Sequence, residues 1–100
     1  MKAYTLCGSM RFEKEMREIA YDLEARSGYN ILQCAYCPDN CKPTDEELSR
    51  LASAHYKKID LSDGIYVVNI GDYIGESVQK EIAYAQKQGK EILYHCSTKE

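Results

Sequence analysis

The segment Ile65–Ile70 (IYVVNI) constrains the fold of this chain more than any other, because it is apolar on both of its alternating faces. It follows Asp63-Gly64, a pair that favours a turn. A strand that is apolar on both faces is typical of the centre of a parallel sheet, where helices cover both sides. We therefore expect an α/β domain built around this strand.

Three other short segments have the composition of strands, and they lie at residues 2–7, 29–34 and 91–94. The segment between the first two has helical periodicity and begins at Ser9, a residue suited to cap a helix. Gly28 is expected to end this first helix. Its apolar residues recur on one face, and they are Phe12, Met16, Ile19, Ala20 and Leu23.

A second helix is expected to begin at Thr44, which has the spacing of a capping box with Glu47. The proline- and cysteine-containing residues 35–43 before it form a loop. The third helix is expected over 76–88, before Gly89. The second helix has one apolar stripe that includes a histidine, and its members are Leu48, Leu51, Ala52, His55 and Ile59.

Strands that alternate with helices in the order β-α-β-α-β-α-β predict a three-layer fold with a four-stranded parallel sheet. In such sheets, ligands bind at the carboxyl ends of the strands, near the point where the strand order reverses. We therefore expect residues 8–11, 35–43 and 69–77 to meet around a single site.

The bulk composition excludes several classes of protein. One hundred residues predict a single domain spanning residues 1–100, with a core thin enough to favour a homodimer or a higher homo-oligomer. The formal net charge of −3, with both signs interspersed, argues against nucleic acid as a partner. No apolar run approaches the ~20 residues that span a membrane. The first ten residues do not resemble a signal peptide, and with the odd number of cysteines they favour the cytoplasm and reduced thiols.

The first candidate site is the turn formed by Gly8, Ser9, Met10 and Arg11 after the first strand. A glycine lets a ligand approach the backbone, and the following helix N-terminus offers N–H groups to an anion such as phosphate. The alternative is an ordinary turn with a serine cap. The full Gly-x-Gly-x-x-Gly fingerprint is absent, so we expect no dinucleotide and no other cofactor.

The second candidate site repeats this arrangement after the central strand, with Gly75 and Ser77 at the start of the third helix. Glu81 lies further along that helix, at the border of its apolar side. A carboxylate at this position is placed to point into a pocket at the sheet edge. The alternative is a solvated side chain paired with Lys80 or Lys87.

A third candidate is the cluster Cys34, Cys37 and Cys41, whose thiols are of a type that binds zinc or an iron–sulfur cluster. The spacing matches no standard motif for either, so free thiols and no metal are the preferred interpretation. A fourth ligand would have to come from the remaining cysteines and histidines, which are Cys7, Cys96, His55 and His95.

His55 is a further candidate on the stripe of the second helix. A single histidine on an apolar helix face is more often a core residue than a catalyst. It nevertheless lies on the helix that leads into the central strand, eight residues before Asp63, from where its side chain is able to reach the site.

The two turns together resemble a known family. Cys7–Arg11 is similar to the phosphate-binding turn of the deoxynucleoside 5′-monophosphate N-glycosidases, in the nucleoside 2-deoxyribosyltransferase-like superfamily. Asp63–Ile70, followed by Glu81–Ala85 and Gly89-Lys90, is similar to the second half of that superfamily. The resemblance implies a Rossmann-like or flavodoxin-like fold, and a small-molecule nucleoside or nucleotide as ligand.

The resemblance also implies roles for individual residues. Glu81 falls at the nucleophilic glutamate of the family, and Ser9 and Ser77 fall in its phosphate- or sugar-contacting loops. His55 stands where relatives place an aspartate that handles the departing base, which makes it the candidate proton donor. Weaker candidates for contacts to the sugar or base are Tyr4, Asn69 and Tyr73.

Two other functions remain open from the sequence. The same loops would serve a nucleotide-binding or sensing module without catalysis. The cysteine loop would serve a metal-binding interaction domain.

Overall fold

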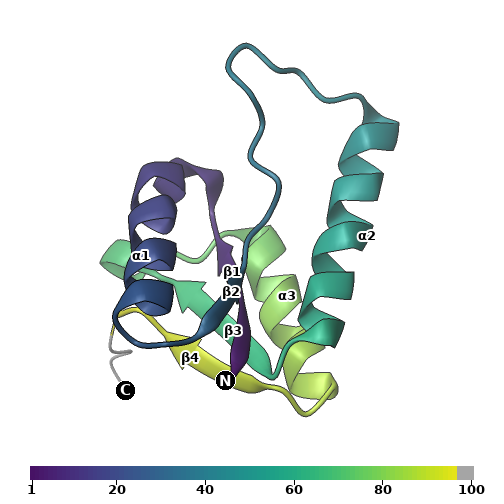
Figure 1. Ribbon diagram of the computed structural model, residues 1–100. Helices are drawn as coiled ribbons and strands as arrows, with labels where there is room; N and C mark the ends of the chain where they lie inside the picture. Colours follow the sequence, from purple (N-terminus) through teal and green to yellow (C-terminus); the bar gives the residue numbers. More distant parts are fainter. Residues whose placement is uncertain (97–100) are drawn as a thin grey trace.

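The computed structural model describes residues 1–96, which form an α/β fold (Figure 1). Two short 3₁₀ helices, Met10–Phe12 and Ile70–Asp72, follow the first and third strands. The remaining elements, in chain order, are β1 (Ala3–Gly8), α1 (Glu13–Ala25), β2 (Asn30–Leu32), α2 (Asp45–Leu61), β3 (Gly64–Val68), α3 (Glu76–Lys87) and β4 (Glu91–Tyr94).

The four strands form one parallel sheet in the order β2-β1-β3-β4. Helix α1 covers one face, whereas α2 and α3 lie on the other (Figure 1). This is the three-layer Rossmann- or flavodoxin-like arrangement that the element order predicts. The strand order reverses between β1 and β3, so ligands are expected at the carboxyl ends of these two strands.

The core is divided between the two faces of the sheet because successive strand residues point to opposite sides. On the α1 side, Leu6 packs with Met16 and Ile19. On the side of α2 and α3, Cys7 packs with Ile59. Strand β3 is buried on both faces, as its composition predicts.

The observed ends of the first helix differ from the predicted ends by a few residues, whereas the start of the second helix agrees. Ser9 caps the 3₁₀ helix that precedes α1, and its Oγ accepts a hydrogen bond from the Arg11 N–H at 3.3 Å. Gly28 has the expected left-handed backbone (φ 76°), but α1 already ends at Ala25. The capping box of α2 is confirmed, because Thr44 and Glu47 exchange hydrogen bonds of 2.8 and 3.2 Å.

The apolar stripe of α2 packs only in its second half. Ile59 is fully buried, whereas Leu48 and Leu51 are exposed. Figure 1 shows the first turns of α2 standing away from the sheet, next to the loop that precedes them. Periodicity therefore identified the correct side of this helix, but the sheet is too short to cover it.

The expectation of free thiols in the loop before α2 is wrong for two of its cysteines. Cys37 and Cys41 form a disulfide, and their Cα atoms lie 5.9 Å apart, within the range such a bond requires. The free cysteines are Cys7, Cys34 and Cys96. Because a disulfide removes both thiolates, the alternative metal site at Cys34, Cys37 and Cys41 is not formed.

Among the described residues, no helix combines the length and apolar character that crossing a bilayer requires.

Candidate functional site

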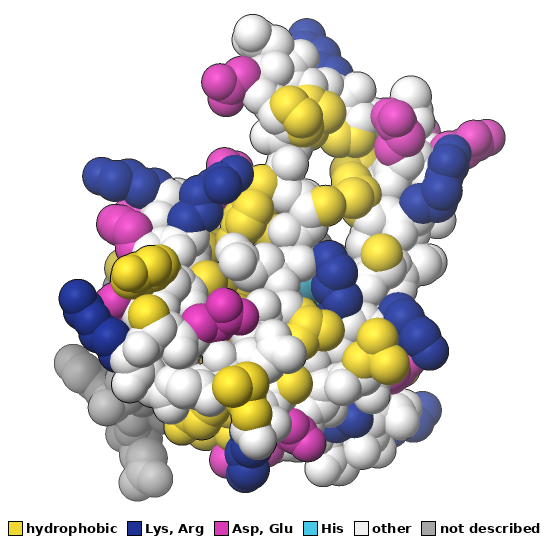
Figure 2. Space-filling view, viewed as in Figure 1, with side chains coloured by type: hydrophobic (Ala, Val, Ile, Leu, Met, Phe, Trp, Pro, Cys, Tyr) yellow, Lys and Arg dark blue, Asp and Glu magenta, His cyan; other side chains and the backbone are white. Residues whose placement is uncertain are grey.

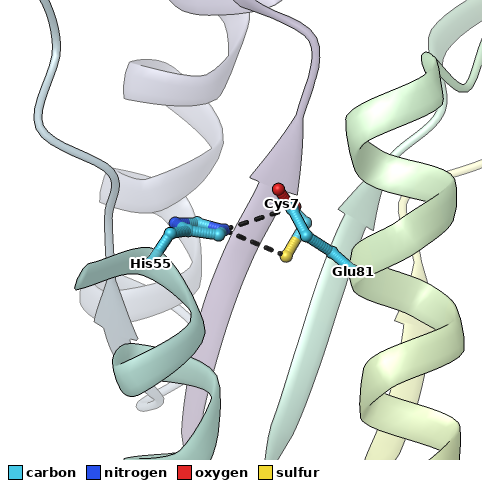
Figure 3. Close-up of side chains that lie close together, drawn as sticks. All are labelled: Cys7, His55 and Glu81. Carbon is cyan, nitrogen blue, oxygen red and sulfur yellow. Dashed lines mark hydrogen bonds and ion pairs between the residues drawn. The ribbon is translucent and has the colours of Figure 1, made fainter. Parts of the chain in front are cut away.

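Three side chains from three different elements converge at the carboxyl end of β1 (Figure 3). Cys7 extends from β1, His55 from α2 and Glu81 from α3. The His55 Nε2 lies 3.5 Å from the Cys7 Sγ and 3.3 Å from the Glu81 Oε1. The group therefore brings a thiol, an imidazole and a carboxylate into mutual contact, and their ligand atoms lie within 4.8 Å of one another.

Local sequence explains why two of these side chains face inward. His55 precedes the fully buried Ile59 by one helical turn, so both lie on the side of α2 that faces the sheet. Glu81 lies between the buried Val78 and Ala85 at helical spacing. The side chains of His55 and Glu81 are only 12% and 15% exposed, so the interpretation of Glu81 as a solvated residue is not supported.

The Glu81 charge acts on the ionisable groups beside it. Burial, followed by the Glu81 charge, raises the pKa of the Cys7 thiol well above its usual value. Burial and the same carboxylate raise the pKa of Tyr56. Cys7 is therefore a neutral thiol beside Glu81 at neutral pH.

The His55 ring has one unpartnered nitrogen. Its Nδ1 is buried and has no hydrogen-bond partner among residues 1–96. All polar contacts of the ring therefore pass through Nε2, the atom that faces Cys7 and Glu81. Nε2 is therefore the ring atom placed to exchange a proton with a ligand at this site.

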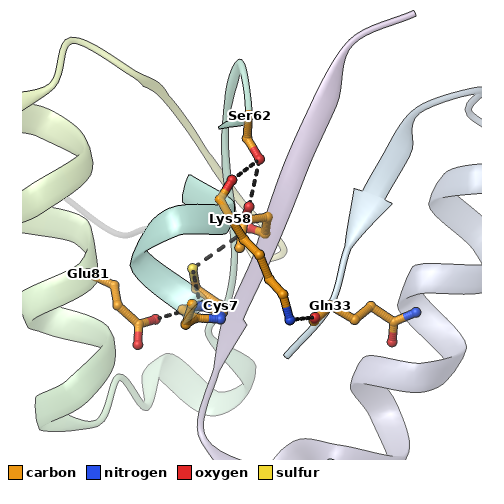
Figure 4. Close-up of polar contacts among 7 residues, drawn as sticks. Cys7, Gln33, Lys58, Ser62 and Glu81 are labelled. Carbon is orange, nitrogen blue, oxygen red and sulfur yellow. Dashed lines mark hydrogen bonds and ion pairs between the residues drawn. The ribbon is translucent and has the colours of Figure 1, made fainter. Parts of the chain in front are cut away.

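Polar contacts near the site hold the C-terminal half of α2 against the sheet (Figure 4). The Lys58 ammonium donates a 2.6 Å hydrogen bond to the Gln33 carbonyl, just beyond β2. The Ser62 hydroxyl lies 2.6 Å from the Thr5 hydroxyl of β1 and donates to the Lys58 carbonyl. These contacts hold the helix that carries His55 against the strand that carries Cys7.

A cavity of about 690 Å³ adjoins this group, within the range typical of small-molecule sites. Figure 2 shows the molecule hollowed between α2 and the body of the domain, with hydrophobic side chains gathered beside the hollow. The described lining includes Leu6, Gly8, Ser9, Met10, Met16, Cys34, Ala35, Leu51, Ala52, Ala54, His55, Tyr56, Lys58, Tyr73, Gly75, Glu76, Ser77, Val78, Lys80 and Glu81.

Most of the site residues expected from the sequence meet at this cavity. Both glycine turns contribute, and Ala35 represents the loop at residues 35–43, so all three segments predicted to meet line the cavity. The expected residues that line the cavity are Gly8, Ser9, Met10, His55, Tyr73, Gly75, Ser77 and Glu81.

Gly8 also has a packing role that the sequence did not reveal. A Cβ atom at this position would lie 3.0 Å from the Met16 Sδ and 3.0 Å from the Val68 Cβ. The absence of a side chain therefore lets α1 pack closely on β1, in addition to leaving the backbone open to the cavity.

Three expected contact residues lie away from the cavity. The Arg11 guanidinium stacks 3.7 Å from the centre of the Tyr73 ring. Tyr73 lines the cavity, and Arg11 lies behind it. Tyr4 is buried near the amino end of β1, away from the site at its carboxyl end, and donates a hydrogen bond to Glu91. The Asn69 side chain is buried and bonded to the Cys96 backbone.

The sequence did not reveal that Cys7 contacts His55, or that Tyr56 and Lys58 line the cavity. It offered Lys80 as an ion-pair partner of Glu81, whereas Lys80 pairs with Glu76 at 3.6 Å. From the sequence, Cys7 was the first residue of the phosphate-binding turn and one of four candidates for a fourth metal ligand. Its inward direction follows from strand alternation once Leu6 is placed on the α1 side. Lys58 follows His55 by three residues, which puts both on neighbouring positions of one helix face.

A scan against family models finds no match to this chain, and searches of curated proteins and of solved structures likewise find no similar protein.

Proposed function

We propose that this protein cleaves or exchanges the N-glycosidic bond of a deoxynucleoside or its 5′-monophosphate, with Glu81 as the nucleophile. The observation that carries the proposal is the position of the Glu81 carboxylate. It lies largely shielded from bulk water, beside His55, in a cavity that it shares with both glycine turns. This is the arrangement that the resemblance to the N-glycosidases requires.

The reaction would follow the retaining mechanism of glycoside hydrolysis, with a covalent glycosyl-enzyme intermediate. A Glu81 oxygen bonds to C1′ of the sugar as the C1′–N bond breaks, and the bonding electron pair leaves with the base. A doubly protonated His55 donates its Nε2 proton to the departing base nitrogen and becomes a neutral imidazole. Water, or a second base, then attacks C1′ of the glycosyl ester and releases the Glu81 carboxylate.

Other lining residues support binding of a nucleotide. The hydroxyls of Ser9 and Ser77 lie in the two turns that adjoin Glu81, and Lys58 and Lys80 bring positive charge to the lining. Gly75 precedes helix α3 at the N-cap position and has no side chain to cap it, so the first N–H groups of the helix are free of competition from a capping side chain. These groups match the charge and hydrogen-bonding capacity of a phosphate.

The decisive experiment incubates the purified protein with the four deoxynucleosides and their 5′-monophosphates and follows free base by liquid chromatography. We expect base release by the wild-type protein, and a loss of at least about 1000-fold in Glu81→Gln. Glu18→Gln, an exposed change on α1, is the matched control and should retain the wild-type rate.

The same experiment separates catalysis from a nucleotide-binding module. Saturable binding of a monophosphate without release of base would favour the module and remove Glu81 as a nucleophile. Release of base by Glu81→Gln at the wild-type rate would likewise contradict the mechanism. A cytoplasmic location and a homo-oligomeric state remain predictions, tested by fractionation and by light scattering.

A further inference from the structure

We propose that Cys7, His55 and Glu81 form a zinc-binding site. The three donor atoms are the Cys7 Sγ, the His55 Nε2 and a Glu81 carboxylate oxygen, and all lie within 4.8 Å of one another. They come from β1, α2 and α3, so the fold and not a local sequence motif brings them together (Figure 3). The Cys34–Cys37–Cys41 cluster considered from the sequence contributes no ligand.

The spacing of the donor atoms fits a tetrahedral zinc ion. Zinc binds sulfur at about 2.3 Å, and nitrogen and oxygen at about 2.0–2.2 Å. Tetrahedral angles then place a sulfur and a nitrogen ligand about 3.6 Å apart, and a nitrogen and an oxygen ligand about 3.4 Å apart. The observed Cys7–His55 and His55–Glu81 distances are 3.5 and 3.3 Å. These two pairs already have the tetrahedral spacing, and the third pair, Cys7 and Glu81, lies within 4.8 Å.

The donor types select among metals. Magnesium and calcium prefer oxygen ligands, so a sulfur and an imidazole nitrogen disfavour both. A mixed sulfur, nitrogen and oxygen set with tetrahedral spacing favours zinc. Three protein ligands leave a fourth position, which is the pattern of zinc sites that keep one place for water or a ligand.

The charges of the complex also balance. Zinc bound to a cysteine thiolate, a neutral histidine and a glutamate carboxylate has no net charge, which suits a site this little exposed. On binding, the Cys7 S–H bond breaks, a sulfur–zinc bond forms and one proton passes to the buffer. The neutral His55 ring carries its proton on Nδ1, so that the Nε2 lone pair coordinates the ion. No oxidant or reductant takes part.

The proposed zinc site bears on the proposed function in one respect. Zinc would occupy both the carboxylate that attacks the sugar and the nitrogen that carries the transferable proton. Bound zinc would therefore inhibit base release, and a chelator would restore it. This consequence rests on the proposed function, whereas zinc binding itself does not.

The test uses metal alone, without nucleotide. Chelator-stripped protein is titrated with Co²⁺ in the absence of reductant, so that the Cys37–Cys41 disulfide stays closed. We expect one equivalent of Co²⁺ to produce the near-ultraviolet charge-transfer band of a thiolate ligand, together with the intense visible bands of tetrahedral coordination. Zinc should then displace the cobalt and remove both features.

Variants assign the ligands. Cys7→Ala should abolish the thiolate band, and His55→Gln and Glu81→Gln should each weaken zinc binding at least about 100-fold in a competition assay with a chromophoric chelator. Cys34→Ser, at the free cysteine that lines the same cavity, is the matched control and should leave the spectrum unchanged. Circular dichroism of each variant checks that the fold is intact, and if Cys7→Ala does not fold, the two other ligand variants decide.

The proposal is overturned if the wild-type protein gives no thiolate band at millimolar Co²⁺, or if Cys34→Ser removes the band while Cys7→Ala keeps it. A protein that releases base but binds no Co²⁺ would contradict the zinc site alone. A protein that binds Co²⁺ through these three residues but releases no base would contradict the proposed function alone.

Discussion

The Tyr4 hydroxyl donates a 2.6 Å hydrogen bond to the Glu91 carboxylate, and this bond links β1 to the start of β4 across the intervening strand β3. The Lys2 ammonium contacts the same carboxylate at 3.1 Å. The hydrogen bond to Glu91 is the main cause that raises the pKa of Tyr4 to about 12, and it is also the main cause that lowers the pKa of Glu91.

This pair predicts how stability changes in alkaline solution. The pKa of Tyr4 is higher in the folded protein than in the unfolded chain, so its contribution is fully present below pH 10 and is lost as the pH rises through about 12. Tyr4→Phe removes this contribution. The difference in unfolding free energy between wild type and Tyr4→Phe, measured by urea denaturation, should therefore shrink from pH 9 to pH 12. A constant difference would show that the bond does not form.

His55→Gln should lower the rate of base release about 100- to 10,000-fold, the usual range for loss of a proton donor. Thermal stability should fall less than the rate, because glutamine keeps a polar group beside Cys7 and Glu81 in place of the Nε2 contacts. The Nδ1 has no partner to lose among residues 1–96. His95→Gln is the matched control, since His95 bonds to the Tyr66 hydroxyl and does not line the cavity. An unchanged rate with a large fall in Tm would instead identify His55 as a core residue.

Gly64→Ala should destabilise the fold by about 3 kcal/mol. A Cβ atom there would clash with the Glu91 carbonyl oxygen, and backbone atoms of β4 cannot move aside by changing rotamer. Gly75→Ala is the comparison, because its nearest contact would be the Tyr73 hydroxyl at an ordinary 3.5 Å. We expect the second change to cost about 1 kcal/mol or less, as judged by chemical denaturation. Equal effects would contradict the predicted clash.

The disulfide predicts a specific thiol count. Unfolded, unreduced protein should expose the three free thiols to a thiol reagent, and prior reduction should add those of Cys37 and Cys41. In the folded protein Cys7 should react slowly, because it is buried and its raised pKa keeps the thiolate scarce. Five reactive thiols before reduction would show that the loop is not cross-linked.

The order of elements was predictable from the sequence because local patterns determine it. The apolar face of α1 includes Met16, Ile19 and Ala20, and all three are buried as periodicity predicts. The capping box at Thr44 is equally local. Such patterns depend on residues within one or two turns, and no knowledge of the remaining fold is needed to read them.

The features that the sequence did not predict depend on contacts between distant segments. Helical spacing places Leu48 and Leu51 on one side of α2, but it does not say whether the sheet extends far enough to cover them. Pairing of Cys37 with Cys41 was likewise undetermined, because spacing alone does not fix disulfide connectivity. At the candidate site, the pattern placed Glu81 at the border of a buried face, whereas its contact with His55 required the packing of α3 beside α2.

The contact between Cys7 and His55 joins residues 48 positions apart, and Glu81 follows from yet another element. These groups meet only once β3 has docked beside β1 and both covering helices have settled on the same face. Parallel pairings between distant segments form late because their loop-closure entropy must be overcome first. During refolding, helical circular dichroism should thus recover before catalysis does, and the return of base release would time the last step of assembly.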